Sequence, residues 1–175
     1  LVSSWELLSK ANKLTHALRD LGLKKFDTVA VVLPNSVEYF VVYMACLQAG
    51  FYLVPINWHL AGPEIAYILE DSEAKAFIAS GKNPDMEKAC INAVSEISFD
   101  KKGCITIDEL EGFRHIDDFT KSMPDENPHD RSAGQVMNYT SGTNGKPNGV
   151  KRNLVEGDPD DVLSLFAMIF SFYNI

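Results

Sequence analysis

The sequence is poor in the features that mark several broad classes of protein. It contains only three cysteines, Cys46, Cys90 and Cys104, and their spacing matches no metal-ligand pattern. Reduced thiols in a cytoplasmic protein are therefore expected. No basic leader precedes an apolar stretch, and no apolar run reaches about 18 residues. The sequence thus predicts neither a signal peptide nor a membrane span.

Basic charge is also scarce. The chain has 16 Lys and Arg residues against 24 Asp and Glu residues, which gives a formal net charge of -8. Nucleic acid is excluded as a default partner, because binding a phosphate backbone needs a basic surface. The four histidines (His16, His59, His115 and His129) are scattered along the chain. We predict no metal site from these side chains.

The remaining composition is that of an ordinary globular protein. Hydrophobic residues make up 46% and charged residues 23% of the 175 positions. A chain of this length is typical of one domain, and it can bury about 70% of the surface that it exposes when unfolded. Asp158, Asp160 and Asp161 are expected to be solvated or to begin a helix.

Helical and strand patterns alternate from the start of the chain. Residues 3–21 have the apolar spacing of an amphipathic helix, with Ser3 and Glu6 as a capping box and Gly22 at its end. The apolar run 29–33 predicts a strand buried on both faces. Asn35 is expected to cap a second helix. That helix is apolar nearly all round and should be buried.

The alternation continues to about residue 107. We expect strands at 51–56, 76–79 and 104–107, separated by helices that begin near Pro63 and at Asn83. Strands and helices alternating at these intervals predict right-handed βαβ units with a mostly parallel sheet, so the expected fold class is α/β. The polar stretch 121–134 is expected to be a surface loop or linker, followed by a last strand at 135–139.

The segment 139–150 has the composition of a phosphate-binding loop. It reads Tyr-Thr-Ser-Gly-Thr-Asn-Gly-Lys-Pro-Asn-Gly-Val, with glycines, hydroxyl side chains and one lysine close together. Glycines allow a ligand to approach the backbone closely, and successive N–H groups in a tight turn form a concavity that binds anions. A polyphosphate is therefore the natural ligand.

A plain hairpin turn remains open from the residue types alone. Asn144-Gly145 between two β-type runs is itself a strong hairpin signal. A Walker-type P-loop is excluded, because it requires four residues between its glycines and Ser or Thr after its lysine. Here two residues separate Gly142 from Gly145, and Pro147 follows Lys146.

The same segment resembles the signature loop of the adenylate-forming (AMP-binding) enzymes. Their pattern is Tyr-Thr-Ser-Gly-Thr-Thr-Gly-x-Pro-Lys-Gly-Val, from which this chain departs at Asn144 and Asn148. Residues 29–36, 47–50, 54–60, 65–72 and 74–76 also resemble the beginning of this family, in the same order. The chain thus resembles the amino-terminal part of an acyl-CoA synthetase. Residues 1–175 would then be a partial adenylation domain.

This resemblance implies a reaction and a set of ligands. Such enzymes activate a carboxylic acid, here of the fatty-acid type, with ATP and Mg²⁺ to give an acyl-adenylate, and then transfer the acyl group to coenzyme A. The loop would bind the ATP phosphates. The residues that it implies for this role are Thr140, Ser141, Gly142, Thr143, Asn144, Gly145 and Lys146.

Two departures from the family support an alternative. Asn148 replaces the family's lysine, a role that Lys146 can take over in part. The chain also has no counterpart of the family's acyl pocket or of its carboxy-terminal domain with the catalytic lysine. A catalytically inactive nucleotide-binding remnant or an interaction module is therefore the alternative. The apolar run 166–172 is expected to favour self-association, so a homo-oligomer is also considered.

Overall fold

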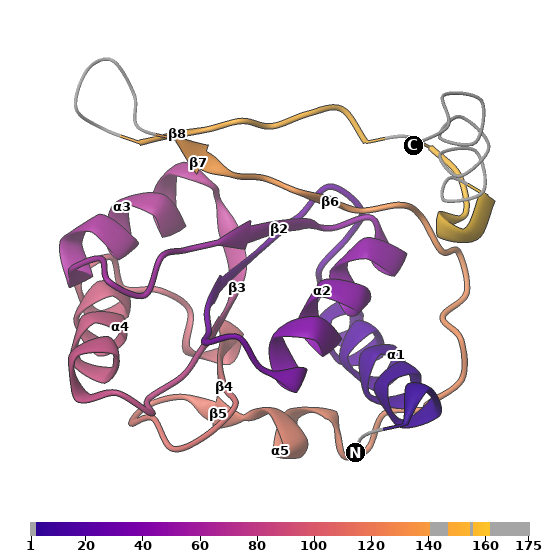
Figure 1. Ribbon diagram of the computed structural model, residues 1–175, viewed down its shortest axis with the longest axis horizontal. Coiled ribbons are helices and arrows are strands. Elements are labelled where there is room, and N and C mark those ends of the chain that lie inside the picture. Colours follow the sequence, from indigo (N-terminus) through magenta and orange to yellow (C-terminus); the bar gives the residue numbers. More distant parts are fainter. Residues whose placement is uncertain (1–2, 141–146, 155, 162–175) are drawn as a thin grey trace.

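The computed structural model describes residues 3–140, 147–154 and 156–161, which form a mixed α/β fold (Figure 1). The expected run 166–172 lies outside the described residues. In chain order the elements are α1 (Ser4–Asp20), β1 (Thr28–Val32), α2 (Val37–Ala49), β2 (Tyr52–Pro55), α3 (Gly62–Asp71), β3 (Ala74–Ala79), α4 (Pro84–Glu96), a 3₁₀ turn (Lys101–Gly103), β4 (Cys104–Thr106), β5 (Arg114–His115), α5 (Ile116–Thr120), β6 (Gln135–Val136), β7 (Tyr139–Thr140) and β8 (Asn148–Gly149).

The main sheet is parallel throughout, as the sequence predicts. Its six strands lie in the order β5-β4-β3-β1-β2-β6. Val29 in β1 is paired with Leu53 on one side and with Ala76 on the other. From β1 the chain first moves outward through β2, and β3 then starts again on the opposite side of β1. The strand order therefore reverses between β1 and β3.

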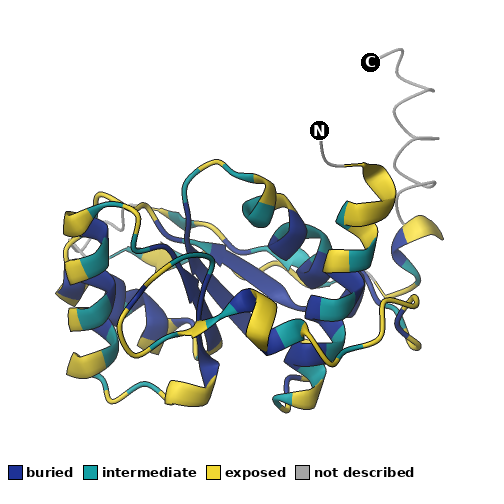
Figure 2. Cartoon of the chain, turned by 90° about the horizontal axis from the view of Figure 1, so that it is seen from below, coloured by how far each residue is buried: buried dark blue, intermediate teal, exposed yellow. Residues whose placement is uncertain are grey.

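Helices cover both faces of this sheet. Val29 and Val31 pack with α1 and α2, whereas Ala30 and Val32 pack with α3 and α4. All five residues of β1 are buried, which accounts for the unbroken apolar run at 29–32. Figure 2 shows the buried residues concentrated in the sheet and on the inner faces of the helices. The core therefore has two halves, one on each side of the sheet.

The helix boundaries predicted from capping residues are largely confirmed. Ser3 Oγ accepts the Glu6 N–H at 3.2 Å, and the Glu6 carboxylate accepts the Ser3 N–H at 2.7 Å. Gly50 ends α2 with φ of 73°, a left-handed conformation that favours glycine. Asn83 caps α4 by accepting the Asp85 N–H at 2.9 Å.

Other expectations are wrong in detail. Ser36 rather than Asn35 caps α2, and its Oγ accepts the Tyr39 N–H at 3.2 Å. Helix α2 is buried on one side only, because Phe40 keeps 50% of its surface exposed. The expected strand at 135–139 is interrupted: β6 pairs with β2, whereas β7 leaves the main sheet and pairs with β8.

The cap of α2 offers a direct test of the local structure. Ser36→Ala should lower the free energy of unfolding by about 1 kcal/mol, because the Tyr39 N–H loses its acceptor at the helix start. Asn35→Ala, one residue earlier, is the matched control and should have little effect. Urea denaturation of both variants checks this, and a larger loss for Asn35→Ala would contradict the assigned cap.

The polar stretch before β6 follows the surface of α1. Residues 121–131 contain neither helix nor strand. Asn12 donates its side-chain N–H to the Asp125 carbonyl at 2.9 Å, and Arg19 donates to the carbonyls of His129 and Asp130 at 2.6 and 3.1 Å. These bonds guide the chain from α5 back to the opposite edge of the sheet. Within the described ranges, no helix has both the length and the apolar character needed to cross a membrane.

Candidate functional site

The glycine-rich segment is framed by a two-stranded hairpin. Strands β7 and β8 are antiparallel, with Tyr139 opposite Gly149 and Thr140 opposite Asn148. The Val150 N–H extends the pair by donating to the Asn138 carbonyl at 2.9 Å. The remaining predicted phosphate-binding residues lie outside the described residues: Ser141, Gly142, Thr143, Asn144, Gly145 and Lys146.

The two sides of this hairpin face different surroundings. Side chains alternate along a strand, and directly opposed residues share a face. Tyr139 donates its phenolic hydrogen to the Asp71 carboxylate at the end of α3, with an O–O distance of 2.7 Å. Burial, followed by the Asp71 contact, raises the pKa of Tyr139. Thr140 and Asn148 are exposed and lie on the other side.

A cavity of about 430 Å³ lies on the side of Thr140. This volume is within the range of small-molecule sites in proteins. Asn138 and Thr140 both contribute to its wall, as expected from the period of two along the strand. The full lining consists of Tyr43, Leu47, Gly134, Gln135, Val136, Asn138, Thr140, Val150 and Arg152. The hairpin thus presents a hydroxyl side chain to a hollow that also contains an arginine.

The chain after the hairpin is fastened to the main sheet. Tyr52 donates its hydroxyl hydrogen to the Arg152 carbonyl at 2.7 Å, and the Lys151 ammonium lies 4.8 Å from the centre of the Tyr52 ring. These contacts join the segment after β8 to β2. Arg152 is therefore held in the wall of the cavity, in a chain that is acidic as a whole.

A cluster of charges holds the segment further along. Arg131 bonds to the Asp160 carboxylate at 2.9 and 3.3 Å and lies 3.4 Å from Asp158. The hydrogen bond from Arg131 lowers the pKa of Asp160. Asp158 also accepts the Asp160 N–H at 2.9 Å, in agreement with the expected helix start. The pairing with Arg131 was not predictable from the sequence, because Arg131 lies 29 residues away from Asp160.

A second crevice lies where the strand order reverses. Ligands of open α/β sheets often bind at such a point, outside the carboxyl ends of the strands. The crevice has a volume of about 480 Å³, and its wall includes Trp58, which follows β2, and Lys82, which follows β3. Neither residue was singled out from the sequence. Each lies two or three residues after a predicted strand, and this position is the signal that could have identified them.

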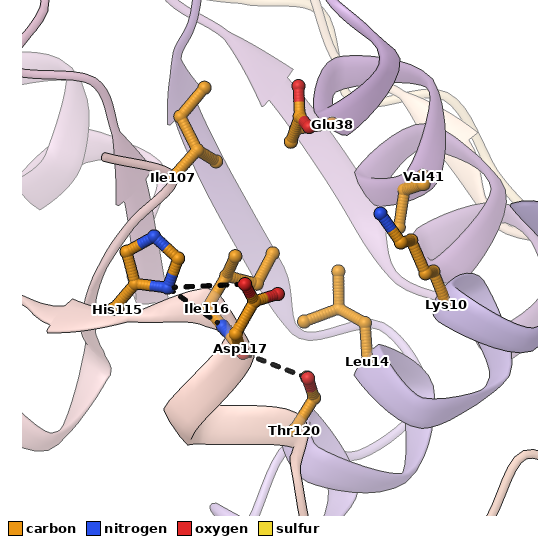
Figure 3. A pocket seen from close by; sticks show the side chains of 9 residues that line it. All are labelled: Lys10, Leu14, Glu38, Val41, Ile107, His115, Ile116, Asp117 and Thr120. Carbon is orange, nitrogen blue, oxygen red and sulfur yellow. Dashed lines mark hydrogen bonds and ion pairs between the residues drawn. The ribbon is translucent and has the colours of Figure 1, made fainter. Parts of the chain in front are cut away.

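Figure 3 shows a smaller hollow between α1, α2 and α5. Its volume of about 90 Å³ is well below that of typical ligand sites. His115 accepts the Asp117 N–H at 3.2 Å, and Thr120 donates its hydroxyl hydrogen to the Ile116 carbonyl at 2.9 Å. Because polar groups at its edge bond within α5, this hollow is best explained by imperfect packing. His115 acts as the cap of a short helix.

The described cysteines are buried thiols. Burial raises the pKa of Cys90 to about 12 and that of Cys104 to about 11, and it also raises the pKa of Cys46. Raised pKa values disfavour the thiolate, which is the reactive form. Over the part of the chain that the structure describes, no group of three or more His, Cys, Asp or Glu side chains is placed to hold a metal ion.

Comparison with known families decides the assignment. The family model described as "AMP-binding enzyme" matches residues 3–154. The chain belongs to the AMP-binding enzyme family. This family assignment agrees with the resemblance seen in the segment 139–150 and accounts for the α/β fold. The matched region includes all the described elements and the hairpin.

Curated relatives extend well beyond the region that they share with this AMP-binding chain. The long-chain-fatty-acid–CoA ligase FadD13 of Mycobacterium tuberculosis is 33% identical over 143 residues, which are 80% of this chain and 27% of the relative. The 2-succinylbenzoate–CoA ligase of Bacillus licheniformis is 32% identical over 149 residues, or 83% of this chain and 27% of the relative. This AMP-binding chain therefore spans about a quarter of the length of these relatives.

A solved structure has the same fold. The anthranilate CoA ligase AuaEII, in complex with anthranoyl-AMP, superposes with a TM-score of 0.68 and 23% sequence identity. The match covers 89% of this chain and 29% of the ligase chain. At this level of identity the comparison establishes the fold alone.

Proposed function

We propose that the complete protein activates a carboxylic acid with ATP. In the first step a carboxylate oxygen attacks the α-phosphorus of ATP, and the bond to pyrophosphate breaks to give an acyl-adenylate. In the second step the sulfur of coenzyme A attacks the acyl carbon, and AMP leaves. The observation that carries this proposal is the hairpin β7–β8, which bears the family's loop sequence at the edge of a cavity of about 430 Å³.

The residues at this site fit a polyphosphate ligand. The exposed hydroxyl of Thr140 is next to the cavity, and Arg152 lies in its wall. The sequence adds Lys146 and Lys151, so three basic residues occur within seven positions of a chain with a net charge of -8. The proposal assigns the phosphates to Thr140, Ser141, Thr143 and Lys146 and to the backbone N–H groups of Gly142, Asn144 and Gly145.

These groups would act by binding and by stabilising charge. Donors fixed in place before the reaction stabilise the negative charge that develops on the phosphates, and they hold the α-phosphorus in line with the attacking carboxylate. Mg²⁺, when bound to ATP, would neutralise part of the phosphate charge. The described residues offer no ligand cluster for it, so the proposal assigns no protein ligand to the metal.

A fatty acid is the proposed substrate class. FadD13, which is 33% identical to this chain, is named as a ligase of long-chain fatty acids. The succinylbenzoate ligase is nearly as similar at 32%, so an aromatic acid is the main competitor. Asn148, which stands where the family has a lysine, favours a second candidate function: a nucleotide-binding remnant without turnover.

Pyrophosphate release by the complete gene product tests this function. With ATP and Mg²⁺, a long-chain fatty acid should raise the rate of release above a blank without acid, and benzoate should raise it less. This 175-residue chain alone should release none, because it spans about 27% of the relatives. ATP binding without release for any acid would favour the remnant instead, and a preference for benzoate would refute the fatty-acid assignment.

A further inference from the structure

One side chain connects the hairpin to the body of the protein. Tyr139 lies in β7, and its hydroxyl reaches Asp71 Oδ2 at 2.7 Å, at the last residue of α3. Figure 1 shows the hairpin above the end of this helix. Helix α3 is itself fixed, because Ile65, Ile68 and Leu69 are buried in the core. The contact therefore ties the base of the hairpin to the main sheet through a packed helix.

The partner strand is built to receive the same ring. Gly149 lies opposite Tyr139, and a Cβ added at this glycine would be 2.9 Å from Cζ of the ring. Such a distance is below ordinary van der Waals contact. The Tyr139 ring thus lies flush against bare backbone of β8 while its hydroxyl bonds to α3. One residue consequently holds three elements together.

Asp71 is unusual in its position. The carboxyl end of a helix carries partial negative charge, which disfavours an acidic side chain there. Asp71 nevertheless ends α3, in a last turn that has no basic residue. Tyr67 donates to Asp71 Oδ1 at 3.4 Å, and Tyr139 donates to Asp71 Oδ2 at 2.7 Å. The two phenols supply the donors that offset the unfavourable helix end.

We propose that Asp71 and Tyr139 are positioning residues that set the orientation of the phosphate-binding hairpin relative to the sheet. The inference rests on the proposed function for its catalytic consequence only. Neighbouring side chains of β7 point to opposite sides of the strand. Because the contact holds Tyr139 against α3, Thr140 is directed toward the cavity on the other side. Without the contact, the hairpin loses its fixed direction, and its strand pairing opens more readily.

The test compares two Tyr→Phe substitutions, each of which removes one hydroxyl donor to the carboxylate of Asp71. In the complete protein, Tyr139→Phe should raise KM for ATP by about three- to tenfold, the loss expected for one hydrogen bond, with kcat nearly unchanged. Tyr67→Phe, the matched control, leaves the hairpin contact in place and should change KM less than twofold. Asp71→Asn keeps an acceptor oxygen, so its KM for ATP should lie between that of the wild type and that of Asp71→Ala.

Hydrogen exchange provides a readout that does not depend on activity. Tyr139→Phe should speed exchange of the Val150 amide, which closes the hairpin, and leave the amides of β1 unchanged. Faster exchange in a protein that shows no turnover would uphold the positioning role and refute the proposed function. Unchanged exchange and an unchanged KM for ATP would overturn the inference, as would equal effects of Tyr139→Phe and Tyr67→Phe.

Discussion

Replacing Gly134 with alanine should lower the free energy of unfolding by about 3 kcal/mol, because the added methyl group has no space. A Cβ at this position would lie 2.5 Å from the Phe51 carbonyl oxygen and closer still to that of Cys46. Both obstacles are backbone atoms, which cannot rotate away as a side chain can. The Gly134 N–H also donates to the Leu47 carbonyl at 2.7 Å, so the chain cannot move outward without losing this bond.

The substitution Gly134→Ala should also disturb the hairpin of the candidate site. Gly134 is the last residue before β6, whose pairing with β2 leads directly into the hairpin. Gly112→Ala is the matched control: its Cβ would meet nothing within 4 Å, and its φ of 81° gives a strain cost of about 1 kcal/mol. Urea denaturation with a common m-value compares the two variants. Equal losses would show that the chain is not tightly packed at Gly134.

Most of the elements before residue 107 could be predicted from the sequence because their signals are local. The capping box of Ser3 and Glu6 lies within one helical turn, and Gly50 marks the end of α2 by its own conformational freedom. The strand β1 was recognisable because both its faces are buried, and residues 29–32 are all apolar. Each of these signals depends on neighbouring residues only.

Short and irregular elements gave no such signal. Strand β5 has two residues and α5 has five, so neither is long enough to show a period. The break after β6 was also hidden, because the residues 135–139 have strand-like character throughout. What separates β6 from β7 is the change of partner from β2 to β8. Partner choice depends on tertiary structure and cannot be deduced from these residues alone.

The candidate site was likewise only partly predictable from the sequence. Phosphate binding by the loop from Thr140 to Lys146 could be predicted because its residues are contiguous in the sequence. The contact of Tyr139 with Asp71 joins residues 68 positions apart, and the fold alone brings them together. Trp58 follows β2 and Lys82 follows β3, and they line one crevice because both strands pair with β1. The ligand chemistry is thus a prediction from the sequence, whereas the contacts that hold the segment are visible only in the structure.

Asn148→Lys in the complete protein should tighten ATP binding or speed adenylation by about tenfold to a hundredfold, equivalent to about 1.5–3 kcal/mol. Asn148 is exposed and lies directly opposite Thr140, so both side chains are on the side of the hairpin that faces away from α3. A lysine here would bring an ammonium group close to the residue that is proposed to contact the phosphates. A charged donor binds a triphosphate more strongly than the neutral amide that it replaces.

Lys146 supplies the competing explanation and the control. If Lys146 already provides the cation, Asn148→Lys will change little and Lys146→Ala will be severe. ATP titrations of both variants at low and moderate salt distinguish these cases. Any gain from Asn148→Lys should shrink as salt rises, because mobile ions screen the attraction between exposed charges. If neither substitution alters ATP affinity or rate, the segment 139–150 does not bind phosphate near positions 146 and 148. A plain hairpin turn then explains its Asn-Gly sequence better.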